Sequence, residues 1–151
     1  MKKQVITMLV VFSALPLTSS AELSWGTERD NCFKQEKTIP LAYDCLAKKK
    51  DESNRKLDVL ISETDKRIKA NNIGPFNGKE DAKETSGDVY SNRFLAAQEK
   101  WKQYRQALCL AVATEIDEDA YDYQSWRDQC EINLNKRHMD EIHLMGLPPV
   151  S

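Results

Sequence analysis

The chain has 151 residues, of which 30% are charged, and its formal net charge at pH 7 is −2. This length allows one domain with its own hydrophobic core. The mild negative charge, and the lack of a basic patch with interleaved aromatic residues, argue against nucleic acid as a partner and favour cationic or neutral partners.

The first 21 residues have the layout of a cleaved secretory signal peptide. Lys2 and Lys3 form a basic start, an uncharged apolar run follows, and Ser19 and Ala21 have the spacing of a signal peptidase site. The apolar run is shorter than the roughly 20 residues of a membrane-spanning helix, so no stable membrane insertion is expected after cleavage. The removed segment contains two lysines and no acid, so the mature chain has 130 residues and a net charge of −4. We expect it in a bacterial periplasm.

Four cysteines remain in the mature chain, namely Cys32, Cys45, Cys109 and Cys130. An even number of cysteines in a small exported domain indicates disulfides, and four cysteines allow three pairings. We favour Cys32–Cys45 and Cys109–Cys130, because pairing of neighbours closes short loops at low strain. No two cysteines have CxxC spacing, so we expect neither zinc nor another cofactor.

The first part of the mature chain predicts two helical segments. One helical turn is expected over residues 31–37, and Thr38 and Pro40 mark the start of a helix that extends to about residue 71, since proline is tolerated in a first turn. The run KKKDESNRK in its middle is weakly patterned and leaves a kink or break open. The predicted core positions at helical spacing are Leu46, Leu57, Leu60, Ile61 and Ile68.

A polar stretch with several glycines predicts a long loop at about residues 71–90, followed by a helix over residues 91–115 capped by Ser91. In that helix Gln98, Trp101 and Arg105 share one face. The Arg105 guanidinium can stack on Trp101 one turn away, and Gln98 can bond to a neighbouring helix. We interpret this face as a helix–helix contact that fixes register, in preference to a ligand site.

The acidic run EIDEDAYDY is expected to lead into a last helix, since negative charge suits a helix N-terminus. Gly146, Pro148 and Pro149 end that helix and leave residues 146–151 as a flexible tail. No alternating strand pattern is present, so the predicted fold is all-α, a small disulfide-stapled bundle of three to four helices. The predicted apolar stripe of the last helix is Tyr123, Trp126, Cys130, Leu134 and Ile142.

The helix over residues 91–115 carries a recognisable series: Ala97, Gln98, Trp101, Tyr104, Arg105 and Cys109. This series, with the layout of the other cysteines, resembles the signature of the LprI-like lysozyme inhibitor family across a helical domain of residues 22–145. One departure is Gln106, where the family usually has an aspartate. The resemblance implies an exported, non-enzymatic protein that inhibits a lysozyme.

The predicted loop contains SGDVY, in which Ser86, Gly87 and Tyr90 match the SGxxY pattern of the MliC and PliC type of lysozyme inhibitors. Hydroxyl groups on a protruding loop can hydrogen-bond the two carboxyl groups of a glycosidase cleft and occlude it. An acidic inhibitor would also be steered toward a basic c-type lysozyme. The competing interpretation, which we favour for this motif, is a chance match with Ser86 or Asp88 beside a helix cap.

Two other classes of function compete with a lysozyme inhibitor. The alternative is an envelope interaction module, or an immunity protein that neutralises a delivered toxin, because such a protein would also be small, exported, acidic and disulfide-stapled. An enzyme is not expected. The two histidines, His138 and His143, lack the spacing of a zinc site on a helix and are expected at the surface near the end of the last helix.

Overall fold

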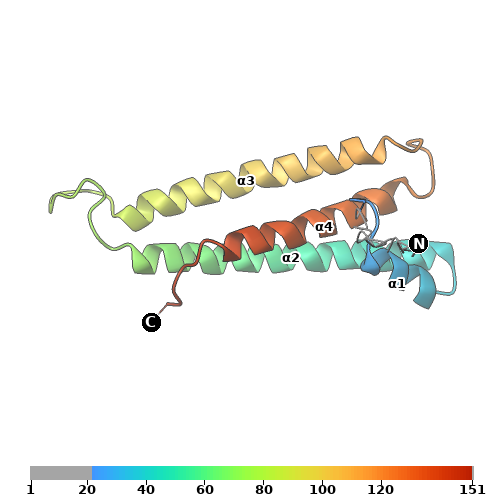
Figure 1. The fold of residues 1–151 in the computed structure, drawn as a ribbon, viewed down its shortest axis with the longest axis horizontal. Helices are drawn as coiled ribbons and strands as arrows, with labels where there is room; N and C mark the ends of the chain where they lie inside the picture. The colour runs from blue at the N-terminus through green and yellow to red at the C-terminus, as the bar shows by residue number, and fades with distance from the viewer. Residues whose placement is uncertain (1–21, 151) are drawn as a thin grey trace, which may run out of the picture.

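The computed structural model describes residues 22–150, so the predicted signal peptide lies outside the described residues. The fold is all-α, as predicted, with no strand between residues 22 and 150. The long helices α2, α3 and α4 pack against one another, and the short helix α1 lies against the first part of α2 (Figure 1). The helices are α1 (Thr27–Gln35), α2 (Ile39–Asn71), α3 (Ser86–Ala113) and α4 (Tyr123–His143).

Helix α2 is the backbone of the bundle. Thr38 is its N-cap residue and Pro40 lies in its first turn, as the sequence predicted. The helix continues without a break through the charged run in its middle, so the kink that the weak patterning left open does not occur. Helix α1 starts at Thr27, four residues before the predicted helical turn, and ends at Gln35.

The core is built from one face of each long helix. Leu57, Ile61 and Ile68 of α2 meet Phe94 of α3 and Ile142 of α4. Leu46 forms a second centre under α1 with Cys32 and Ile132. These leucines and isoleucines of α2 were predicted from helical spacing and are buried, which confirms the periodic pattern, whereas Leu60, also predicted as core, is only partly buried. Leu147, in the predicted tail, packs against the first centre.

Two disulfides link neighbouring helices, and their pairing is the predicted one. Cys32–Cys45 joins α1 to α2, and Cys109–Cys130 joins α3 to α4. The bonded cysteines are 13 and 21 positions apart in the sequence, and for loops of this size the loop-entropy model gives about 3 kcal/mol of stabilisation each. Two disulfides in a small domain indicate an oxidising compartment outside the cytoplasm. Within residues 22–150, no helix is both long enough and apolar enough to cross a membrane.

The start of α3 differs from the prediction. The helix begins at Ser86 instead of Ser91, so the connection between α2 and α3 is shorter than the predicted loop of residues 71–90. Thr85 is the cap: its Oγ1 accepts a hydrogen bond from the Asp88 backbone N–H at 3.0 Å, and Asp88 Oδ2 accepts one from the Thr85 N–H at 2.9 Å. This capping box satisfies free N–H groups of the first turn. Ser91 is buried instead, and its hydroxyl donates to Asp65 of α2.

Candidate functional site

The face of α3 that carries Gln98, Trp101 and Arg105 points into the bundle. Gln98 and Arg105 are buried, and Trp101 is half-buried between them. The guanidinium carbon of Arg105 lies 5.5 Å from the centre of the Trp101 ring, which is the predicted cation–π contact. This face therefore forms a helix–helix contact, as interpreted from the sequence.

His138 of α4 is the partner of this face, and its predicted surface position is wrong. Its ring stacks on Trp101 with centroids 3.8 Å apart and an interplanar angle of 8°. His138 Nε2 lies 2.7 Å from Gln98 Oε1, and Nδ1 lies 2.9 Å from Glu141 Oε2. The side chain is buried because this stacking and pairing require contact with α3, whereas His143 is exposed as predicted.

Arg105 is the centre of a buried polar cluster that joins the three long helices. Its Nη1 donates hydrogen bonds to Asn54 Oδ1 of α2 at 2.9 Å and to Asn135 Oδ1 of α4 at 2.6 Å. Its Nε lies 3.7 Å from Glu131 Oε2. Burial lowers the pKa of the Arg105 guanidinium, and the carboxylates of Glu131 and Asp58 partly offset this effect. A buried cation held by hydrogen bonds and one carboxylate fixes how the helices meet.

The residues of the family-like series therefore serve mainly the scaffold. Gln98, Trp101 and Arg105 bind α4, and Cys109 is bonded to it through the disulfide. Tyr104 and Ala97 are the members of the series that face outward, and Tyr104 has 56% of its surface exposed. A partner that contacts the α3 surface would meet Tyr104 and Ala97, and not the four side chains that bind α4.

The structure places Ser86, Gly87 and Tyr90 in the first turns of α3, so their predicted position in a loop is wrong. The competing interpretation had placed this motif beside a helix cap, and Asp88 is part of that cap. Gly87 is buried because α2 passes close by: its N–H donates to Asn72 O at 2.7 Å, and an added Cβ would lie 3.0 Å from the same oxygen. Tyr90 remains 38% exposed.

The connection between α2 and α3 projects from one end of the bundle (Figure 1). It is tied back by a hydrogen bond from Phe76 N–H to Glu84 O at 3.0 Å and by one from Ser86 N–H to Gly74 O at 2.8 Å. Phe76 is 52% exposed, with the Arg93 guanidinium carbon 5.6 Å from its ring centre. This tip therefore exposes one aromatic ring that is covered in part by a guanidinium.

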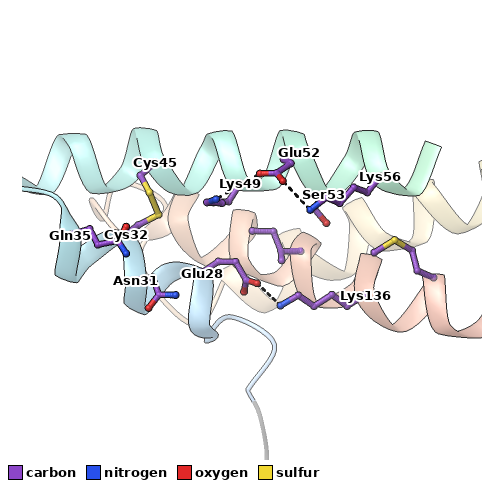
Figure 2. Close-up of a pocket in the computed structure, with 12 residues that line it drawn as sticks. Glu28, Asn31, Cys32, Gln35, Cys45, Lys49, Glu52, Ser53, Lys56 and Lys136 are labelled. Atoms are coloured by element: carbon purple, nitrogen blue, oxygen red, sulfur yellow. Dashed lines mark hydrogen bonds and ion pairs between the residues drawn. A yellow bond between two sulfur atoms is a disulfide. The ribbon is translucent and has the colours of Figure 1, made fainter. Parts of the chain in front are cut away.

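A charged groove with a volume of about 350 Å³ lies between α1, α2 and α4 (Figure 2). Three lysines and two glutamates line it, and Lys49 lies 3.7 Å from a Glu52 carboxylate that it shares with Lys56. Lys136 pairs with Glu28 across it at 2.5 Å, and Lys56 pairs with Glu52 along α2 at 2.9 Å. No histidine lines it, and its cysteines form the first disulfide. The lining therefore provides ion pairs that brace α1 against α4, without an activated nucleophile.

The end of the bundle opposite to the α2–α3 connection carries the acidic charge. The connection between α3 and α4, residues 114–122, contains five acidic residues and no basic one. Asp122 is held by Arg29 at 3.3 Å and by the Tyr43 hydroxyl at 2.7 Å. The exposed acids of this connection are Glu115, Asp117, Glu118 and Asp119. Over residues 22–150, no group of three or more His, Cys, Asp or Glu residues is placed to hold a metal ion.

Comparison with known proteins adds no assignment to this geometry. No protein-family model, no curated protein and no solved structure matches the chain.

Proposed function

We propose that the protein is an exported, periplasmic, non-enzymatic binding protein that inhibits a basic lysozyme by covering its active-site cleft. The proposal draws on the likeness of residues 97–109 to the LprI-like signature. It is carried by one observation on the molecule, the one-sided distribution of charge. The connection of residues 114–122 has a charge of −5, whereas the rest of the mature chain sums to +1.

This distribution suits a cationic protein partner. An exposed acidic end on a rigid scaffold raises the rate of encounter with a basic protein, and salt screens that effect within about 10 Å at 0.1 M. The scaffold itself is braced by two disulfides and a buried polar cluster. Little conformational entropy is therefore lost on binding, as is usual for inhibitors that act by occlusion.

The test is lysis of a cell-wall suspension by a c-type and a g-type lysozyme in the presence of the secreted protein. We expect inhibition of the basic c-type enzyme that weakens as salt is added. A variant with Glu115, Asp117, Glu118 and Asp119 changed to their amides should associate more slowly. The matched control changes the tip acids Glu80, Asp81 and Glu84 to amides and should inhibit like the wild type. Full lysis at a large molar excess would reject the lysozyme target and leave the envelope interaction module or the immunity protein.

The hydroxyl mechanism has a test of its own. A Ser86→Ala/Tyr90→Ala double variant removes both side-chain hydroxyls of the SGxxY match and keeps the Thr85–Asp88 cap. If these hydroxyls enter the cleft, the double variant loses inhibition while its helical circular dichroism is unchanged. Unchanged inhibition would place the contact surface elsewhere on the molecule.

A further inference from the structure

We infer that a small acidic cavity beside Trp126 receives an arginine or lysine side chain of the protein partner, an inference that rests on the proposed function. The cavity has a volume of about 230 Å³ and lies where the segment before α1 meets the end of α3 and the start of α4. Its lining residues are Glu22, Leu23, Ser24, Val112, Glu115 and Trp126.

The polar groups of this cavity are acceptors that suit an organic cation. Glu22 and Glu115 line it, no lysine, arginine or histidine does, and neither carboxylate is in an ion pair within residues 22–150. Cleavage after Ala21 makes Glu22 the first residue of the mature chain, and its single α-ammonium offsets at most one of the two carboxylates. Ser24 is only 2% exposed, and its Oγ has no hydrogen-bond partner among the described residues. A guanidinium has five N–H donors and no acceptor, so it matches two carboxylates and a hydroxyl.

The remaining walls suit the rest of such a side chain. The indole ring of Trp126 is held edge-on by Trp25, with ring centroids 6.3 Å apart, and a tryptophan ring is the best aromatic surface for a cation. Leu23 and Val112 provide apolar contacts for an aliphatic stem. The volume is below the roughly 300–1,000 Å³ of sites for drug-sized ligands, which favours one side chain over a larger molecule.

The position of the cavity connects it to the acidic end of the bundle. Glu115 belongs both to the cavity and to the acidic connection of residues 114–122. Long-range attraction by that connection would bring a basic partner to this end, and the cavity would then fix one of its cationic side chains.

The experiment titrates the secreted protein with N-acetyl-arginine amide and follows the Trp126 indole N–H by NMR. The neutral isostere N-acetyl-citrulline amide is the probe control. We expect saturable shifts with the arginine probe and about tenfold weaker binding of citrulline, because charge-assisted hydrogen bonds are lost. Glu115→Gln should weaken the arginine probe severalfold. Glu118→Gln, a matched change in the same connection outside the cavity lining, should leave binding within about twofold.

Three outcomes separate this inference from the proposed function. Equal shifts with both probes, or equal binding by the Glu115→Gln and Glu118→Gln variants, would overturn the cation site. If Glu115→Gln loses the probe but inhibits lysozyme like Glu118→Gln, the partner does not use the cavity and the inference is overturned. If the probe binds as expected while wild-type protein fails to inhibit any lysozyme, cation recognition stands and the lysozyme target is rejected.

Discussion

The buried Arg105 allows a sharp test of how the bundle is held together. Arg105→Met keeps an unbranched stem beside Trp101 but removes the guanidinium. Two hydrogen bonds, to Asn54 and Asn135, are lost, and the buried carboxylate of Glu131 loses its nearest cation. Each hydrogen bond to a charged group contributes about 1.5 kcal/mol or more. Removing one partner of a buried pair typically costs about 3–5 kcal/mol, so we expect a loss of about 3 kcal/mol.

Urea unfolding followed by circular dichroism measures this loss. With a urea m-value of about 2 kcal/mol/M, the midpoint should fall by about 1.5 M. The matched control is Lys102→Met, three residues earlier on α3, which removes a partly exposed ion pair with Asp58. That change should cost no more than about 1 kcal/mol.

A double variant isolates the unpaired charge. Arg105→Met/Glu131→Gln removes the carboxylate as well as the guanidinium, so it should be more stable than Arg105→Met alone. The reasoning fails if Arg105→Met destabilises the protein no more than Lys102→Met does. It also fails if the added Glu131→Gln change lowers stability further, because the carboxylate would then be stabilised by other groups.

Three further results are expected. Gly87→Ala should lower the free energy of unfolding by about 1–3 kcal/mol, because the added Cβ would press on the backbone of α2. Gly74→Ala is the control, since an added Cβ there has no atom within 4 Å, and it should change the free energy of unfolding far less. Equal losses for the two variants would contradict the close approach of α2 to Gly87. Cys109→Ser/Cys130→Ser should lower the free energy of unfolding by about 3 kcal/mol in the same urea assay, and mass spectrometry that finds free thiols in secreted wild-type protein would contradict the bridge. Burial and the hydrogen bond to Asp122 raise the pKa of Tyr43 from 10.0 to about 12. The protonated Tyr43 phenol therefore stabilises the folded protein below pH 10, and this stabilisation is lost as the pH rises to 12. In an ultraviolet titration, the Tyr43→Phe variant should lack the phenol that ionises late in the wild type.

Helical periodicity predicted most of this fold but misplaced the start of α3. The predicted loop end was set by Gly87 and by the serines around it, since glycine is a poor helix former. The capping box of Thr85 and Asp88, three residues apart, was the signal for the true start. Gly87 is accepted in the helix because α2 lies too close for a side chain there, and that requirement comes from tertiary packing.

Of the buried polar residues of the candidate site, the sequence predicted those on α3 but missed their partner on α4. The α3 face was found because Trp101 lies between Gln98 and Arg105 at helical spacing. Its partner His138 was missed because charge at a helix end suggested a surface position. The stripe Cys130, Leu134 and Ile142 has a gap at residue 138, and that gap marked the histidine as an inward position. Hydrophobicity alone does not detect a polar residue whose partners come from another helix.

The buried residues of the family-like series hold the scaffold together and are not available to a partner. Gln98, Trp101 and Arg105 are occupied with α4, so they constrain the fold of any chain that shares them, and they leave the choice of target to other residues. On this molecule, exposed side chains suited to a partner lie at its two ends, namely Phe76 at the α2–α3 connection and the acids of residues 114–122. Because those ends lie apart from the buried cluster, we expect that changes there alter the surface offered to a partner and leave the scaffold intact. Exchange of the exposed acids Glu115, Asp117, Glu118 and Asp119 should therefore alter binding while the unfolding midpoint stays within the range of ordinary surface substitutions, provided that Asp122 is kept for its bonds to Arg29 and Tyr43.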